Sequence, residues 1–600
     1  MKPTHMFLGV LLSLVAYTHS QYVPIYVESS QGLQTPALEG GRTELELADV
    51  NNDGHLDILS IGDHGSPFIN TQEHGIMVWF GDGAGQWSVF QYGNFGYGGI
   101  AVGDVNNDGL LDVGYGMHHD YSSNDLGDQL IEVALGDGTG MFWTPWDDGL
   151  ATNGEDWGMF GTDFADIDLD GDLDIIANSF GCCAGVHVYR NNGDGTWTQS
   201  FGFIGGNSTD DVVFGDVNND GIPDFAVAHQ YGTVYLGDGS GDFTLADGNL
   251  PPAGSIGRYG PDLGDIDNDG RDELSFCNSN HGVEIWKWSE GNNWTKIASG
   301  LPSSGDYDAT QIYDMDMDGF KDLAAFGDGQ VTVWKGDGGG QWVEIATISL
   351  PSPGRFRAFR VEGDADHNGY PDIALVDEEG SWLNYQNHLR FFKEASPADS
   401  LSISPVFPGP GRLVWVNSVQ TIRWISEVPA GDSSRVHLDL YQGDTTNYLF
   451  TIADSLPNNG HFQWQIPLTI SQSGPFFIRY EVSTHSQSVH SFTPGGFFIG
   501  MVVDINKSQE VLADQVALLQ NYPNPFNSQT KISFYLSKHQ FISLQIFDIR
   551  GRIVKKLLNQ PLSAGFHEIR FDAAGLASGV YYYQLKGLNY HQARKMVYIR

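Results

Sequence analysis

Asp49-Val-Asn-Asn-Asp-Gly-His-Leu-Asp57 is the stretch that decides the fold of this 600-residue chain. A fixed period near fifty residues indicates a repeat architecture, in which each repeat is one supersecondary unit. Six more copies follow at steps of 49 to 62 residues, beginning at Asp104, Asp166, Asp216, Asp265, Asp314 and Asp364. The chain is therefore expected to begin with an array of seven such units.

Each copy has the composition of a calcium-binding loop, with side-chain oxygens at positions 1, 3, 5 and 9 and glycine at position 6. Calcium takes six to eight oxygen ligands in irregular geometry, and glycine permits the tight turn. Position 7 varies in type, as expected if it supplies only its backbone carbonyl. We expect up to seven Ca²⁺ ions, one per repeat, held by Asp49, Asn51, Asp53, His55 and Asp57; Asp104, Asn106, Asp108, Leu110 and Asp112; Asp166, Asp168, Asp170, Asp172 and Asp174; Asp216, Asn218, Asp220, Ile222 and Asp224; Asp265, Asp267, Asp269, Arg271 and Glu273; Asp314, Asp316, Asp318, Phe320 and Asp322; and Asp364, Asp366, Asn368, Tyr370 and Asp372.

The loops are not EF-hands, which need a bidentate Glu at position 12 between two helices. Here position 12 is Ser60 in the first copy and Tyr115 in the second, and the flanking segments have the pattern of strands. The alternative is a set of Asp- and Asn-rich turns that bind nothing.

Charge and the first residues indicate export. The formal net charge is −45, which argues against nucleic acid as a partner because that needs basic surfaces. Residues 1–20 have the form of a secretory signal, with Lys2 before a short apolar run. No later segment is long and apolar enough to span a membrane. The three cysteines, Cys182, Cys183 and Cys277, do not make a disulfide framework; a vicinal bridge and buried thiols both stay open.

The spacing predicts an all-β chain that begins with a seven-bladed β-propeller over residues 21–396. Each acidic loop is followed by two strands, a glycine turn such as Gly81–Trp87, a third strand and the strand before the next loop. Units of four strands and about fifty residues are typical of propeller blades. The remaining segment Tyr22–Glu28 is expected to add an outer strand to the last blade and to close the ring.

The loop pattern D-x-[DN]-x-[DN]-G-x-x-[DE], followed by G-D-G-x-G-x-[WF], resembles the FG-GAP/VCBS repeat family, which also forms integrin α-chain propellers. The resemblance implies that the calcium loops join the first and second strands of each blade. It does not settle a function, because such propellers bind proteins, bind sugars or accompany catalytic modules.

Long connections are expected on the face opposite the calcium loops. They cover residues 63–75, 117–129 and 144–159, in three adjacent repeats. Long loops on a rigid scaffold often carry recognition, although neutral loop growth is the alternative. We expect an extracellular protein or glycan to bind there, near His118, His119, Tyr121, Trp146 and Trp157.

No catalytic residue is assigned. Residues 21–397 contain only 13 Lys and Arg, whereas lyases of acidic sugars need cationic groups and a base. A nucleophile elbow, a zinc motif and a P-loop are absent from the sequence. The expected function is therefore non-catalytic adhesion or recognition; the alternative is a secreted carbohydrate-active enzyme, either a polysaccharide lyase or a glycoside hydrolase, on a propeller scaffold.

Two small β-sandwich domains are expected after the propeller, with linkers at 397–410 and 501–515. Residues 411–500 contain alternating strands such as Val436–Tyr441 and His461–Ile466. Their order and motifs resemble the Ig-like domain of fungal cell-wall and Ser/Thr-rich GPI-anchored proteins, which implies a spacer or adhesive role.

Residues 516–600 form the second sandwich and hold 11 Lys and Arg against 3 Asp and Glu. The run Asn521-Tyr-Pro-Asn-Pro-Phe-Asn527, the strands that follow it and the terminal Lys595–Arg600 closely resemble the type A sorting domain of the type IX secretion system. The resemblance implies recognition by that machinery and export to the medium or to the outer-membrane surface of a Gram-negative bacterium. It also implies that the protein can be attached to surface lipopolysaccharide.

Overall fold

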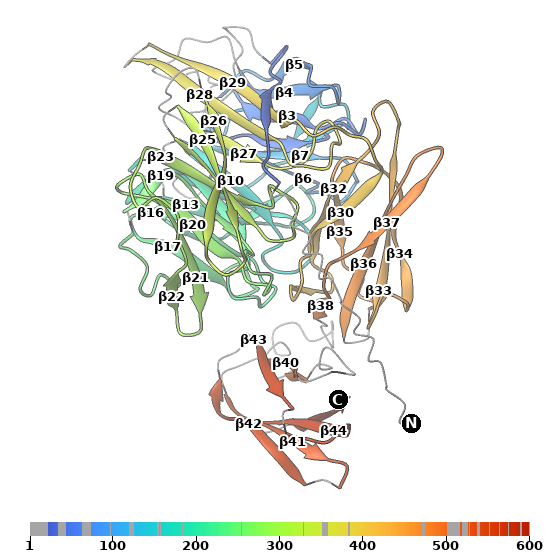
Figure 1. Cartoon of the computed structure of the whole chain (residues 1–600). Coiled ribbons are helices and arrows are strands. Elements are labelled where there is room, and N and C mark those ends of the chain that lie inside the picture. Colours follow the sequence, from blue (N-terminus) through green and yellow to red (C-terminus); the bar gives the residue numbers. More distant parts are fainter. Residues whose placement is uncertain are drawn as a thin grey trace, which may run out of the picture.

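A computed structural model describes residues 22–33, 44–62, 74–96, 98–118, 125–152, 155, 158–179, 181–182, 185–253, 255–327, 329–350, 358–381, 384–470, 474–500, 516–518, 526, 529–536, 540–550, 552–562, 565–573, 575–587 and 591–598. Every regular element in these residues is a β-strand (Figure 1), which confirms the expected all-β class. Consequently, the described part of the chain has no helix of the length and hydropathy needed to cross a membrane.

The repeat region folds into antiparallel sheets in which the strands follow one another from the inside outwards. The strands of successive sheets are β2 (Glu46–Ala48), β3 (Asp57–Ile61), β4 (Ile76–Gly81) and β5 (Trp87–Tyr92); β6 (Ile100–Gly103), β7 (Asp112–Gly116), β8 (Ile131–Gly136) and β9 (Trp143–Pro145); β10 (Met159–Ala165), β11 (Asp174–Ser179), β13 (Val186–Asn191) and β14 (Trp197–Phe203); β15 (Asn207–Gly215), β16 (Asp224–His229), β17 (Gly232–Gly237) and β18 (Phe243–Leu245), with β12 (Gly181–Cys182) beside β15; β19 (Ile256–Gly264), β20 (Glu273–Asn278), β21 (Val283–Ser289) and β22 (Asn293–Lys296); β23 (Tyr307–Tyr313), β24 (Asp322–Gly327), β25 (Gln330–Gly336) and β26 (Trp342–Ser349); and β27 (Phe359–Val361), β28 (Ile373–Ser381), β29 (Asn384–Glu394) and β1 (Tyr26–Glu28).

Each sheet is packed between its neighbours, so the middle strands are buried on both faces. In β3 all five residues are buried, which explains why these strands are nearly continuous apolar runs. The innermost strands contact one another in chain order from β2 to β27. Arg360 of β27 then donates from Nε to the carbonyl of Leu45, next to β2, at 3.0 Å. These sheets are compatible with the blades of a β-propeller, which the acidic repeats predict.

The first described strand joins the last sheet, as expected from the sequence. Tyr26 of β1 pairs antiparallel with Glu394 of β29, so the two ends of the repeat region are held in one sheet. Ala395 continues this pairing, because its amide donates to the carbonyl of Ile25 at 2.8 Å.

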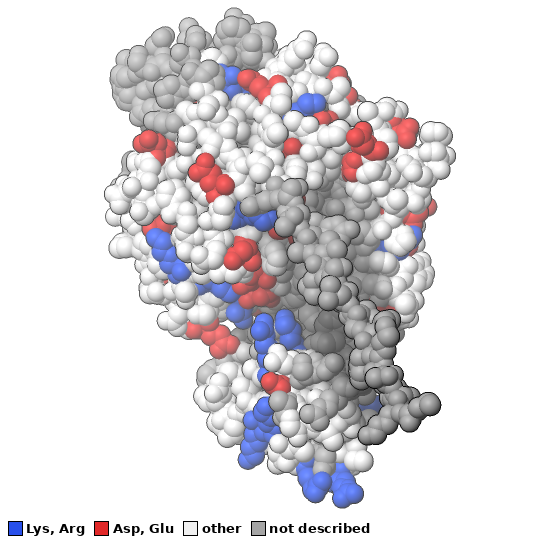
Figure 2. All heavy atoms as spheres, viewed as in Figure 1, with Lys and Arg blue, Asp and Glu red and all other residues white. Residues whose placement is uncertain are grey.

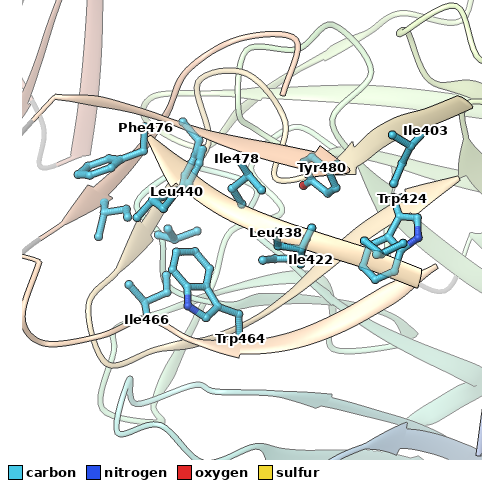
Figure 3. Packing of buried hydrophobic residues seen from close by; sticks show 14 of the residues in the cluster. Ile403, Ile422, Trp424, Leu438, Leu440, Trp464, Ile466, Phe476, Ile478 and Tyr480 are labelled. Atoms are coloured by element: carbon cyan, nitrogen blue, oxygen red, sulfur yellow. The ribbon is translucent and has the colours of Figure 1, made fainter. Parts of the chain in front are cut away.

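The middle domain is a two-sheet sandwich. One sheet contains β30 (Ser402–Phe407), β32 (Val419–Glu427) and β35 (His461–Gln465); the other contains β31 (Leu413–Trp415), β38 (Phe497–Gly500), β36 (Pro475–Ser483), β33 (Arg435–Gln442), β34 (Tyr448–Pro457) and β37 (Ser488–Phe492). Figure 3 shows side chains of both sheets meeting in the core, with Trp424 and Trp464 facing Leu438 and Tyr480.

The expected linker 397–410 contains a strand of this sandwich. Strand β30 pairs with β32, and Pro405 lies opposite Trp424. Proline suggested a linker, but it is tolerated in an edge strand because it removes only a donor that faces away from the sheet. Strand β30 is such an edge.

The C-terminal domain has two further sheets. They contain β39 (Val516–Leu518), β40 (Gln529–Leu536) and β43 (Gly565–Asp572), and β42 (Ile553–Leu562), β41 (Gln540–Asp548), β44 (Gly579–Lys586) and β45 (His591–Tyr598). A core that includes Phe534, Ile546 and Tyr583 lies between them. Figure 2 shows Lys and Arg side chains gathered on this domain, at the bottom of the view.

Candidate metal sites in the acidic loops

Each acidic loop joins the first two strands of one sheet, and its carboxylates hold the loop backbone. In the first loop Asp49 accepts hydrogen bonds from the amides of Asp53 at 3.0 Å and Gly54 at 2.9 Å. Asp57 accepts from the amide of Val50 at 3.1 Å. The other loops repeat this pattern, for example at Asp314 and Asp322 in the sixth. Hydrogen bonds within the loop therefore turn these carboxylates inwards without the help of an ion.

The turn depends on two residues with a left-handed backbone, at positions 4 and 6 of the loop. Glycine at position 6 has a positive φ in every loop, for instance 92° at Gly54 and 95° at Gly319. Position 4 also has a positive φ, from 55° to 61°, at Asn52, Asn107, Leu169, Asn219, Asn268, Met317 and His367. The glycine was expected from the sequence. The positive φ at position 4 was not expected. Asn, which tolerates this conformation, is the residue there in four copies.

Four loops bring three carboxylates together. In each group, one carboxylate oxygen per residue lies within 4.8 Å of the others: Asp166, Asp168 and Asp174; Asp265, Asp267 and Asp269; Asp314, Asp316 and Asp322; and Asp364, Asp366 and Asp372. In all four the Oδ1 atom at position 3 is buried and has no hydrogen-bond partner (Asp168, Asp267, Asp316 and Asp366). A buried carboxylate oxygen without a partner is costly, and a set of oxygen donors around it suits a hard cation. The residues of these loops fit calcium.

The other three loops have asparagine at position 3, and the amide is satisfied within the loop. Asn51 donates from Nδ2 to Asp53 at 3.0 Å and accepts from the amide of Asp53 at 2.9 Å. Asn106 makes the same two contacts with Asp108, each at 3.0 Å. Asn218 accepts from the amide of Asp220 at 2.8 Å. The side-chain oxygen at position 3 is therefore tied to the backbone of its own loop.

Four basic side chains, which the sequence interpretation missed, reach the position-3 carboxylates. Lys287 lies with Nζ 2.8 Å from Asp267, 3.0 Å from Asp269 and 2.6 Å from Glu273. Burial lowers the pKa of Lys287, but these three carboxylates raise it by more, so it is held above its usual range. The corresponding pairs are Arg190 with Asp168, Lys335 with Asp316 and Asp318, and Lys393 with Asp366.

Three carboxylates at position 9 of the loops are harder to ionise than free aspartate. Burial raises the pKa of Asp57, Asp112 and Asp322 to about 8 each, although backbone amides lower it again in part. A bound cation is the usual way to keep such groups ionised. Proton and metal are therefore expected to compete for them.

The Ig-like domain packs on the loops. Asn219, at position 4 of the fourth loop, accepts from the amide of Leu413 at 2.8 Å and donates to the carbonyl of Gly411 at 3.0 Å. Arg412 forms a buried ion pair with Asp272. Further hydrogen bonds join Val419 to Asp166, Gln463 to Asp104, Asn459 to Asp49, Trp415 to Asp220, Asn417 to Leu169 and Val428 to His367. The loop face of the repeat region is thus an interface between two domains.

A cavity of about 510 Å³ lies between the innermost strands and the Ig-like domain. Its carboxylates join neighbouring sheets: Asp163 of β10 accepts from the amide of Phe214 in β15 at 2.7 Å, and Asp262 of β19 accepts from Ile312 in β23 at 2.5 Å. We therefore interpret them as structural groups.

The residues expected to bind a partner are only partly described. His118 is 7% exposed and stacks on Phe160, with ring centroids 5.7 Å apart. Trp146 is half-buried and meets Trp197 edge-on. His119, Tyr121 and Trp157 lie outside the described residues, as do the signal segment 1–20, Cys183 and the side chain of Cys182. Cys277 is buried.

Comparison with family models finds three matches in this chain. The FG-GAP-like repeat matches residues 49–115, 179–227 and 314–375. The Kre9/KNH-like N-terminal Ig-like domain matches residues 407–495. The secretion system C-terminal sorting domain matches residues 520–599. The chain therefore carries FG-GAP-like repeats and a sorting domain, as the motifs indicated.

Among solved structures, two similar ones are a bacterial and a fungal protein. PorZ, a surface component of the type IX secretion system of Porphyromonas gingivalis, is 12% identical, with a TM-score of 0.29 over 93% of this chain and 100% of PorZ. An Agrocybe aegerita lectin that recognises non-reducing terminal N-acetylglucosamine is 18% identical, with a TM-score of 0.36 over 52% of this chain and 81% of the lectin. No curated protein matches the chain.

Proposed function

We propose that this secreted FG-GAP-repeat β-propeller protein is a calcium-stabilised, non-catalytic recognition protein. Its C-terminal domain sorts it through the type IX system to the cell surface or outer membrane. Calcium in the acidic loops would supply the charge that lets the converging carboxylates stay ionised. The partner is an extracellular protein or glycan, and surface lipopolysaccharide is the proposed attachment.

The observation that carries the calcium proposal is the unpartnered Oδ1 atom at position 3 of four loops. In the sixth loop, for example, Asp316 is 7% exposed, its Oδ1 has no hydrogen-bond partner, and an oxygen of Asp314 and one of Asp322 lie within 4.8 Å. Calcium accepts such a set of oxygens. Binding to the folded state alone stabilises that state by mass action.

The position of the Ig-like domain supports the choice of recognition face. It lies against acidic loops on one face of the repeat region, where Arg412 pairs with Asp272. A partner is therefore expected on the other face, to which we assign the connections 63–75, 117–129 and 144–159. Rigid strands that present longer loops are a common basis for recognition.

Two measurements test this function. Elemental mass spectrometry of the full chain, after removal of loosely held ions, should find bound calcium; no calcium would contradict the metal proposal. A glycan array and a surface-protein array should then show calcium-dependent binding. The triple variant H119A/Y121A/W157A should bind more weakly than the wild type. Phe142, 60% exposed in the turn after β8 on the acidic-loop side, gives the matched control F142A. Equal binding by both variants would contradict the proposed face.

A further inference from the structure

The third strand of each sheet has one residue that lies beside the acidic loop. The register of the second and third strands defines this residue. The first residue after the acidic loop pairs with a residue of the third strand, as Ile58 does with Trp79, Ile175 with Tyr189 and Leu323 with Trp334. The residue that we compare is the next one along the third strand. The pairs Val113 with Ala134, Phe225 with Tyr235, Leu274 with Trp286 and Ile373 with Phe392 define it in the other sheets. In chain order this residue is Phe80, Leu135, Arg190, Leu236, Lys287, Lys335 and Lys393.

The type of this residue follows the type at position 3 of the same loop. Where position 3 is Asn51, Asn106 or Asn218, the strand residue is apolar (Phe80, Leu135 and Leu236). Where position 3 is Asp168, Asp267, Asp316 or Asp366, the strand residue is basic (Arg190, Lys287, Lys335 and Lys393). The match holds in all seven repeats, and the basic group contacts the position-3 carboxylate in each of the four. The two positions therefore act as one unit.

In the sixth loop the pairing keeps the formal charge equal to that of the fourth loop. The fourth loop offers Asp216, Asp220 and Asp224 with Leu236 on the strand. The sixth loop adds a fourth carboxylate, Asp316, and the cation of Lys335 offsets it. A cation approaching either loop meets the same formal charge. In the sixth, however, two of its expected ligands already hold the ammonium group, since Lys335 also lies 2.6 Å from Asp318.

We propose that Arg190, Lys287, Lys335 and Lys393 are built-in competitors for calcium, so that the chain has three tight sites, in the first, second and fourth loops, and four weaker ones. This inference rests on the proposed calcium function. In the weaker loops calcium must displace a paired cation, whereas the asparagine loops present no such cation. The four weaker loops keep a counter-charge when calcium is low, and the three tight loops rely on the ion.

Native mass spectrometry of the full chain at graded free calcium tests the inference. The chain should take up three ions first and the other four at free calcium about tenfold higher. K335L gives the sixth loop the leucine found in the fourth repeat, and D316N/K335L gives it both residues of that type. Each variant should take up four ions first and three later. Lys296 pairs with Glu284 outside the loops at 2.8 Å and provides the control K296L. This control should take up three ions first and four later, like the wild type.

Each outcome separates the two proposals. Seven ions that bind in one step, or a K335L chain that still fills as three and four, would overturn the competitor role while leaving calcium binding intact. A wild-type chain that takes up no ion would overturn the proposed function and this inference together. The wild-type pattern decides the question even if the variants do not fold.

Discussion

The backbone amide of Val419 in the Ig-like domain donates a 2.9 Å hydrogen bond to the carboxylate of Asp166, the first residue of the third acidic loop. The same carboxylate accepts from Gly171 inside the loop. One candidate metal ligand therefore holds both its own loop and the next domain. Changes in the loops are expected to reach the docking of the Ig-like domain, and the reverse holds by linkage.

The ion pair between Arg412 and Asp272 should be a main anchor of that docking. Its side chains are 9% and 7% exposed, and R412M would leave a buried carboxylate without its partner. Breaking a buried pair in this way costs about 3–5 kcal/mol. Differential scanning fluorimetry should therefore show a lower melting temperature for R412M, whereas R435M, at an exposed residue of β33, should melt like wild type. An unchanged melting temperature for R412M would contradict the docked arrangement.

Arg360 should hold the last sheet of the repeat region against the first. It pairs with Glu46 and donates to the carbonyl of Leu45, and burial raises the pKa of Glu46 to about 8 despite this pairing. R360M should destabilise the protein by roughly 3 kcal/mol. R360K keeps the charge and loses the Nε donor, so urea unfolding should place it between R360M and wild type. Equal midpoints for all three would show that this contact does not close the ring.

Melting temperature should fall with rising pH in chelator, and calcium should offset that fall. Burial holds Asp57, Asp112 and Asp322 at a pKa of about 8, against about 3.9 in an unfolded chain. In chelator, the folded state binds the extra protons, so stability should fall as pH rises from 6 to 8. In calcium the ligands must be ionised, so the stabilisation by calcium should grow over the same range. Parallel melting curves at all pH values would contradict a role for these carboxylates.

The core of the Ig-like domain should depend on Trp424. This side chain is 1% exposed, packs with Ile422 and Tyr480, and donates to Asn458 at 2.8 Å. W424A removes a large buried ring and should cost about 3–5 kcal/mol. W424F fills more of the space and should cost less, which urea unfolding followed by fluorescence can measure. A wild-type midpoint for W424A would mean that the sandwich core is packed differently.

Local patterns in the sequence predict the repeat fold well. Asp49, Gly54 and Asp57 recur at fixed spacing, so the strand–loop–strand unit follows from turn chemistry and apolar runs alone. The pairing of Tyr26 with Glu394 was also predictable, because a repeat array with one strand left over at the front needs a partner for it. By contrast, strand β30 was not predicted, since Pro405 weakens the local strand pattern and only the sandwich edge explains its place.

The interior of the site was predicted less completely. The loop oxygens follow from spacing, but the contact of Lys335 with Asp316 and Asp318 joins residues 19 and 17 positions apart on different elements. Only the sheet register places them together. The contact of Asn219 with Leu413 spans 194 positions and has no local pattern at all. Such contacts depend on how the domains pack, which alternation and turn residues do not encode.

Anomalous diffraction from a crystal of the protein grown in calcium tests the central claim most directly. We predict difference peaks inside the acidic loops, each surrounded by the oxygens of positions 1, 3, 5, 7 and 9 at roughly 2.3–2.6 Å. The absence of a peak from all seven loops would contradict the calcium account.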